Sequence, residues 1–126
     1  GGAAVRVVAM SDTHGYHKGL EVPEGDVLIH CGDATGDGNW GGRARRGEHQ
    51  FSDFVRWFRR QPHPRKFFVE GNHESCQQTR LMMREHLLSG SVSCSGLLIH
   101  GLPYSRSRHG HREIPSGVDV LALACL

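Results

Sequence analysis

The chain of 126 residues lacks several patterns that would assign it to a class at once. Its four cysteines show no C-x-x-C spacing, which argues against a redox motif or a clustered zinc site. Without a secretory context, they are expected to be the reduced thiols of a cytoplasmic protein. No apolar run approaches the ~20 residues of a membrane span, and no signal-peptide pattern is present. We therefore expect neither a membrane protein nor a secreted one.

Charge gives little further guidance. The chain has 15 Lys and Arg against 13 Asp and Glu, and a formal net charge of +2 does not by itself indicate a nucleic-acid partner. The phosphate-loop pattern G-x-x-x-x-G-K-[ST] is absent. No internal repeat or interdomain linker is evident, so we expect one domain over residues 1–126.

What the sequence does contain is three short polar segments, each following an apolar run. D-T-H stands at 12–14, G-D at 32–33 and G-N-H-E at 71–74, after apolar runs near 5–11, 27–31 and 66–70. If these runs are adjacent parallel strands, their carboxyl ends share one edge, where open α/β sheets place their ligands. The sequence therefore predicts that the three segments converge.

The residue types in these segments are those of a metal site. Asp12 and His14 point to the same side if the chain is still extended there, so a carboxylate and an imidazole could hold one ion. Asn72 offers a neutral carbonyl oxygen, which is a hard ligand. Each residue alone could equally be a helix cap or a turn residue. The three segments in this order favour the metal site.

The ordered set D-x-H, G-D and G-N-H-E resembles the calcineurin-like metallophosphoesterase superfamily. Three further stretches, SDTH at 11–14, PEGDVL at 23–28 and IPSGVDVL at 114–121, resemble its metallophosphoesterase-domain-containing group, of class III cyclic-nucleotide-phosphodiesterase type. The likeness runs from Val5 to Leu121. It implies an α/β sandwich of facing mixed sheets, mainly parallel in the centre and flanked by helices.

The resemblance also implies a role for each matching residue. Asp12 and His14 would hold a first ion, Asp33 would bridge two ions, and Asn72 would hold the second. His73 would protonate the leaving oxygen of a phosphate-ester substrate. Manganese, iron and zinc suit such oxygen and imidazole ligands alike.

Three later histidines of the family pattern, in a T-H-G-like and a terminal G-H-x-H segment, are not found in this chain. We therefore expect the N-terminal portion of the usual domain, incomplete at the C-terminus, with the second ion in doubt. His100, His109 and His111 are weaker candidates for the missing ligands, because all three precede the 114–121 stretch. His100 is the best placed of them, at the end of a predicted strand.

Two helices are expected between the strands. Phe51, Phe54, Val55 and Phe58 fall at i, i+3, i+4 and i+7, and prolines at 62 and 64 end that helix. Its Arg56, Arg59 and Arg60 are most simply a solvated side. The second helix is predicted from about Gln77 to Leu88, ended by Gly90. The Gly-rich basic stretch 36–47 is either an exposed insertion or one wall of a substrate cleft.

Two functions remain open at this stage. The first is a metal-dependent phosphoesterase that hydrolyses a phosphodiester or phosphomonoester. The second is a non-catalytic, truncated member of the same family that binds at most one ion or acts as an interaction module. The G-N-H-E segment favours the first function, and the missing histidines favour the second.

Overall fold

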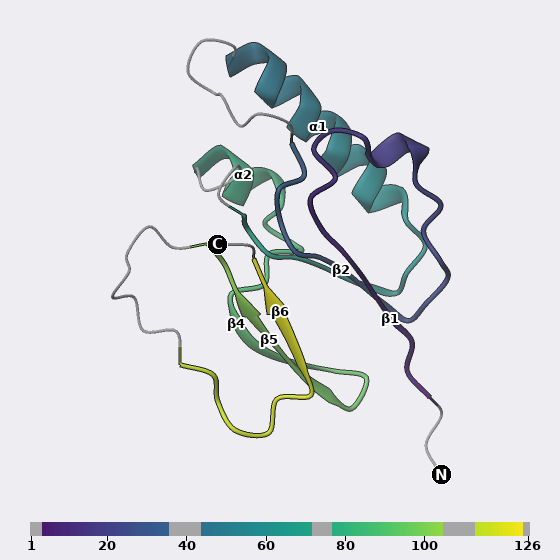
Figure 1. The fold of residues 1–126 in the computed structure, drawn as a ribbon, viewed down its shortest axis with the longest axis vertical. Helices are drawn as coiled ribbons and strands as arrows, with labels where there is room; N and C mark the ends of the chain where they lie inside the picture. The colour runs from purple at the N-terminus through teal and green to yellow at the C-terminus, as the bar shows by residue number, and fades with distance from the viewer. Residues whose placement is uncertain (1–3, 36–43, 72–76, 105–112, 125–126) are drawn as a thin grey trace.

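The computed structural model (Figure 1) describes residues 4–35, 44–71, 77–104 and 113–124, with the backbone alone at 44–50 and 77–78. Its elements, in chain order, are β1 (Val7–Met10), the 3-10 helix η1 (His17–Gly19), β2 (Val27–His30), α1 (Ala44–Arg60), β3 (Arg65–Phe68), α2 (Gln77–Met82), β4 (Gly90–Cys94), β5 (Leu97–Leu102) and β6 (Val120–Leu123). Among these residues no helix is both long and apolar enough to cross a membrane.

The strands form two sheets of three. In the first, β1, β2 and β3 lie side by side in that order and both pairings are parallel. In the second, β5 is central, antiparallel to β4 and parallel to β6. The mixed α/β architecture agrees with the expected calcineurin-like sandwich, and the expected parallel neighbours 5–11, 27–31 and 66–70 are confirmed.

The first sheet is covered on both faces, because alternate residues of a strand point to opposite sides. Leu28 of β2 packs with Phe51, Phe54 and Phe58 of α1. Val27 and Ile29 pack instead with residues of the second sheet, among them Ile99. The layers are therefore α1, first sheet and second sheet. Burial of both faces explains why β2 reads as an unbroken apolar run.

Helix α1 is as the periodicity predicts. Phe51, Phe54, Val55 and Phe58 are all buried, and the helix ends at Arg60, just before the prolines. The ammonium of Lys66 donates to the carbonyls of Phe58, Arg59 and Gln61 at 3.2, 2.6 and 3.0 Å. The Phe58 carbonyl also accepts from the Gln61 N–H at 3.2 Å. The lysine thus adds a donor at the carboxyl end of the helix, where the last carbonyls lack the partners of the helix interior.

The second helix is shorter than expected. It ends at Met82 instead of Leu88, and Leu81 is 65% exposed while Met83 is fully buried. The following segment turns back to β3: Phe68 N–H donates to the His86 carbonyl at 2.7 Å, and Leu88 N–H donates to the Phe68 carbonyl at 2.9 Å. Pairing with an adjacent strand satisfies the same backbone groups that further helix would have used.

Candidate metal centre

The turns after β1 and β2 stay paired beyond the strands. The N–H groups of Asp12, His14 and Gly15 donate to the carbonyls of Gly32, Asp33 and Ala34 at 3.0, 3.1 and 2.7 Å. Two segments that lie about 20 residues apart in the sequence thus run together past the carboxyl edge of the sheet. This pairing brings the D-T-H and G-D segments side by side.

In these two turns the backbone is left-handed at each of the three candidate ligands, Asp12, His14 and Asp33. The φ angles are 56° at Asp12, 44° at His14 and 56° at Asp33. Among the described residues only Ser95 joins them as a non-glycine with positive φ. Such conformations are disfavoured for residues with a Cβ and cluster at functional sites. The expectation that the chain is extended at 12–14 is therefore wrong. Left-handed turns set the directions of these side chains instead.

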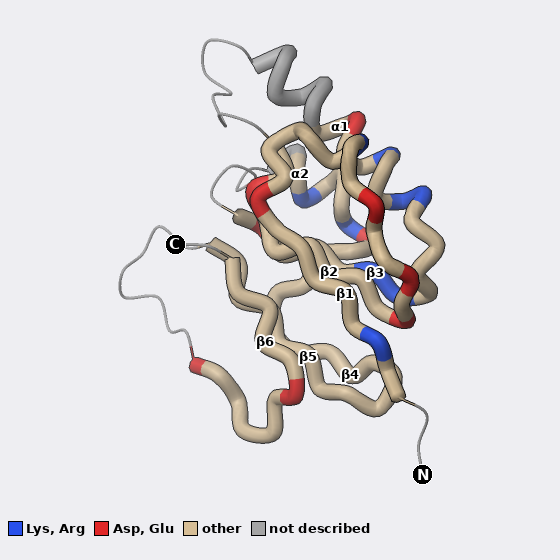
Figure 2. Tube along the Cα trace, turned by 45° about the vertical axis from the view of Figure 1, so that its right-hand side comes forward, with Lys and Arg blue, Asp and Glu red and all other residues tan. Residues whose placement is uncertain are grey.

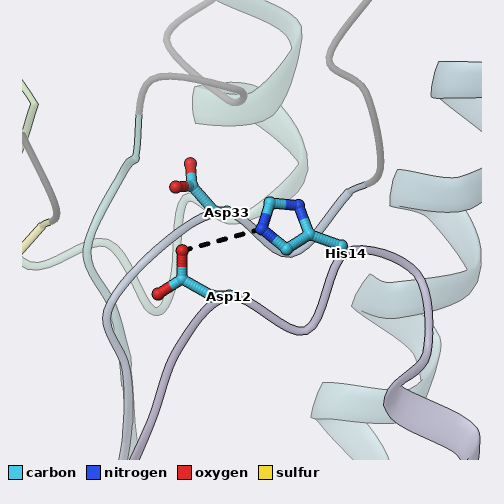
Figure 3. A group of neighbouring side chains, drawn as sticks. All are labelled: Asp12, His14 and Asp33. Carbon is cyan, nitrogen blue, oxygen red and sulfur yellow. Dashed lines mark ion pairs between the residues drawn. The ribbon is translucent and has the colours of Figure 1, made fainter.

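The three side chains point toward one another (Figure 3). One ligand atom from each of Asp12, His14 and Asp33 lies within 4.8 Å of the others. Asp33 is 6% exposed, while the side chains of Asp12 and His14 are 44% and 39% exposed. A buried carboxylate with two more accessible ligands makes a site that is open to solvent on one side.

The imidazole of His14 is oriented as a ligand. Its Nδ1 lies 2.9 Å from the Thr35 carbonyl, which can only accept, so Nδ1 carries the proton. In the neutral ring, the lone pair of Nε2 then faces the Asp12 Oδ1 at 3.6 Å. Two lone pairs in this position repel unless a proton or a cation lies near both. A backbone carbonyl behind the ring is the usual support of a metal-bound histidine, so the donor set fits a divalent ion.

Local contacts favour the charged form of the first carboxylate. The Ser11 hydroxyl donates to Asp12 Oδ2 at 2.6 Å, and this hydrogen bond is the main reason that the pKa of Asp12 lies below its ordinary value. Burial opposes that shift, and His14 adds to it. A carboxylate that stays ionised without metal is ready to bind a cation.

One close backbone contact explains why Gly32 and Gly71 are both glycines. A Cβ on Gly32, whose φ is +93°, would lie 2.6 Å from the Gly71 nitrogen. A Cβ on Gly71 would lie 2.7 Å from the Asp33 nitrogen and would also overlap Asp33 Oδ1. The backbone at Gly71 therefore touches that at Gly32 and Asp33, where a side chain on either glycine would push the two segments apart.

A buried histidine supports the turn between the two exposed ligands. His30, at the end of β2, is fully buried between Phe54 and Phe68. The Gly32 N–H donates to its Nδ1 at 3.2 Å, so the proton sits on Nε2, which donates to the Thr13 hydroxyl at 3.1 Å. Burial lowers the pKa of His30 to about 3, so the ring is neutral.

The predicted site residues divide into two groups. Asp12, His14 and Asp33 come together as described above, whereas Asn72 and His73 lie outside the described residues, as do His109 and His111. His100 is in β5, where its Nδ1 pairs with the Ser91 hydroxyl at 2.7 Å, and it is not in the ligand group found among the described residues. The sequence analysis missed Thr13 and His30, although a histidine within an apolar run was a signal.

Comparison with known proteins agrees with this geometry. The sequence model of the family described as calcineurin-like phosphoesterase matches residues 5–112. A UPF0046 protein of Caenorhabditis elegans is 30% identical over 154 aligned residues, covering 93% of this chain and 52% of the relative. The human metallophosphoesterase domain-containing protein 1 is 36% identical over 69 residues, covering 55% of this chain and 19% of that protein.

A further match is to a protein of Emericella nidulans named probable rhamnogalacturonate lyase C. It is 39% identical over 71 residues, which cover 56% of this chain and 6% of that protein. The chain thus spans about half or less of the length of each of these relatives. Because the family match extends over most of the chain and includes all three polar segments, the chain belongs to the calcineurin-like phosphoesterase family.

Proposed function

We propose that this chain carries the metal site of a phosphoesterase, which hydrolyses a phosphodiester or phosphomonoester. The observation that carries the proposal is the convergence of Asp12, His14 and Asp33 within 4.8 Å at the carboxyl edge of a parallel sheet. Membership of the family supports the same reaction class. The metal-binding role of these residues, the substrate and the cytoplasmic location belong to this proposal.

The residues would divide the work as follows. Asp12 and His14 would hold a first divalent ion, and Asp33 would be shared between this ion and a second one. Asn72 adds a neutral oxygen for a second ion. When bound, such ions supply Lewis-acid activation of water and offset the charge of the phosphoryl group. His73 delivers a proton to the leaving oxygen.

Two carboxylates so close together also predict that metal binding depends on pH. Protons compete with a metal ion for the Asp12 and Asp33 carboxylates and for the Nε2 of His14, whose ligand atoms lie within 4.8 Å of one another. Metal binding therefore releases protons and tightens as pH rises.

The test is hydrolysis of bis(p-nitrophenyl) phosphate and of p-nitrophenyl phosphate with added Mn²⁺, Fe²⁺ or Zn²⁺. We expect turnover that a chelator abolishes and that His73→Ala reduces by about 10²–10⁴-fold, the usual worth of a general acid. The matched control is His86→Gln, because this half-buried histidine contacts the Lys66 carbonyl near the start of β3. Turnover that survives both the chelator and His73→Ala would refute the proposal.

A second candidate is a non-catalytic family member that binds one ion. The observation that favours it is the described ligand group itself: Asp12, His14 and Asp33 lie close enough together to hold one ion. This candidate predicts one bound Mn²⁺ per chain by calorimetry, and no turnover above background. Two tightly bound ions per chain would exclude it and support the enzyme.

A further inference from the structure

A second hollow in the molecule lies outside the metal centre, between η1 and the later part of α1. Its volume is about 240 Å³, and it is lined by Lys18, Asp53, Arg56, Trp57 and Arg60. Three cations against one carboxylate give these side chains a formal charge of +2. Figure 2 shows Lys and Arg residues of the described chain along α1, whereas the strands of the second sheet, β4, β5 and β6, carry none.

The one carboxylate of the hollow is already engaged. Asp53 Oδ2 accepts from His17 Nε2 at 2.9 Å, and its Oδ1 lies 3.3 Å from the ammonium of Lys18. By contrast, the side chains of Arg56 and Arg60 are exposed and make no hydrogen bond or ion pair with the described part of the chain. The positive charge of the two guanidinium groups is thus left uncompensated.

Helix stability explains this pair only in part, because Arg60 stands in the last turn of α1, where a cation interacts favourably with the helix dipole. Arg56 and Arg60 stand one turn apart on α1, where like charges are mildly destabilising. The carboxyl end of the helix is already closed by Lys66, and Arg59 donates to the Met82 carbonyl at 2.9 Å. Lys66 thus donates to carbonyls at the carboxyl end of α1 and Arg59 to the last residue of α2, so neither role requires the arginines of the hollow.

The indole of Trp57 lies between these two arginines in the sequence and is held in place from behind. Its ring centroid is 5.3 Å from that of His17 and 5.8 Å from that of Phe54. The ring of His17 is itself buried and fixed by its hydrogen bond to Asp53. The half-buried indole is therefore a rigid flat surface at which a planar ring could stack.

We propose that this hollow binds a phosphate monoester that carries an aromatic ring. Two guanidinium forks suit the oxygens of one phosphate, and the dianion would balance the formal charge of +2. The ring of the ester would lie against Trp57. The proposal uses none of the metal ligands and is thus independent of the phosphoesterase assignment. The hollow is nevertheless close to the metal centre along the chain, since η1 begins three residues after His14.

Fluorescence of Trp57 provides the test, with phenyl phosphate as the probe. The chain has two tryptophans, so a Trp40→Phe background leaves Trp57 as the single indole. The titration is done in EDTA, which removes divalent ions from the metal centre. We expect saturable quenching at millimolar probe or below, and weaker binding of inorganic phosphate, which has no ring.

In the same background, Arg56→Gln with Arg60→Gln should weaken binding of phenyl phosphate at least tenfold. Arg84→Gln, which removes an exposed charge elsewhere, should leave it unchanged. The melting temperature of the double variant should change little, because loss of the repulsion between the two arginines offsets loss of the interaction of Arg60 with the helix dipole. Quenching that does not saturate, or that persists unchanged in the double variant, would overturn the site. Equal affinity for inorganic phosphate would overturn the role of the ring.

Discussion

The two sheets of this molecule are of equal size but end differently. In the first, parallel pairing directs the ends of β1 and β2 to one edge, and each strand continues into left-handed turns that carry Asp12, His14 and Asp33. In the second, β4 and β5 are antiparallel and are joined by a turn at Ser95 and Gly96. Parallel strand ends also converge in the second sheet, at β5 and β6. The difference therefore lies in the segments that follow the strands: among the described residues, only the turns after β1 and β2 bring candidate metal ligands together.

A similar pair of side chains occurs in both sheets and has different consequences. In the first, His30 is hydrogen-bonded to the hydroxyl of Thr13, which lies in the sequence between the candidate metal ligands Asp12 and His14. In the second, His100 holds the hydroxyl of Ser91, its cross-strand partner in the hairpin. A hydrogen bond between a hydroxyl and an imidazole thus supports the turn after β1 in the first sheet and the pairing of β4 with β5 in the second. Matched substitutions in the two sheets separate these roles.

Asp33→Asn should have the largest effect. The substitution keeps the shape of the side chain but removes the buried charge, so Mn²⁺ affinity should fall by about a hundredfold or more, beyond the 10–100-fold cost of outer contacts. Asp119→Asn is the control in the second sheet, where the carboxylate accepts from Leu98 N–H at 2.7 Å. Calorimetry should show normal Mn²⁺ binding for it. Equal losses in both variants would contradict the assignment.

Gly71→Ala should damage both stability and the site. The added Cβ overlaps Asp33 Oδ1, and overpacking of this kind costs about 1–3 kcal/mol. Gly101→Ala, in β5, meets the Leu88 Cγ at 2.6 Å and should cost similar stability while Mn²⁺ affinity is kept. Urea unfolding and calorimetry on both variants measure the two effects. Normal metal affinity in Gly71→Ala would show that the contact does not position Asp33.

Acid should weaken the first sheet through His30. Its pKa falls from an ordinary 6.5 to about 3 on folding, so below pH 6.5 the unfolded chain binds a proton that the folded chain does not. Stability is therefore full above that pH and is lost as pH falls toward 3, by about 2 kcal/mol between pH 7 and pH 5. Urea unfolding in EDTA should show this slope, and His30→Gln should reduce it. An equal slope in the variant would mean that other groups cause the loss.

Thr13→Val should have the smallest effect. The change keeps the shape of the side chain and removes the hydroxyl that His30 holds, so we expect about tenfold weaker Mn²⁺ binding. Ser91→Ala removes the corresponding hydroxyl from the second sheet and should leave Mn²⁺ binding unchanged. If the two variants bind Mn²⁺ equally well, the His30 contact plays no part in positioning the ligands.

Much of the fold could be predicted from the sequence, because the spacing of apolar residues and the order of apolar runs can be read directly along the chain. The apolar runs predicted three parallel strands, and the i, i+3, i+4, i+7 pattern predicted α1. The second helix was predicted too long because pairing of residues 86–88 with β3 is a tertiary contact. Strand β4, with Gly90 and two serines among its five residues, carries no apolar run and was not predicted.

The sequence predicted which residues come together at the site better than it predicted their backbone geometry. The meeting of Asp12, His14 and Asp33 followed from the motif order, and the structure brings them together. The reason given for the pair at 12 and 14 was strand alternation, whereas the backbone is left-handed at both. Such φ angles depend on hydrogen bonds to residues 32–34, which no local pattern reveals. The roles of Asn72 and His73 stay predictions.

The most direct test of the central claim is an anomalous-difference map from crystals of this chain grown with Mn²⁺. The account predicts a peak in contact with the Asp12 carboxylate, the Nε2 of His14 and the Asp33 carboxylate. His14→Ala crystals should lose or weaken this peak. No peak among these three side chains, or a peak that His14→Ala leaves unchanged, would contradict the claim that the first sheet ends in a metal centre.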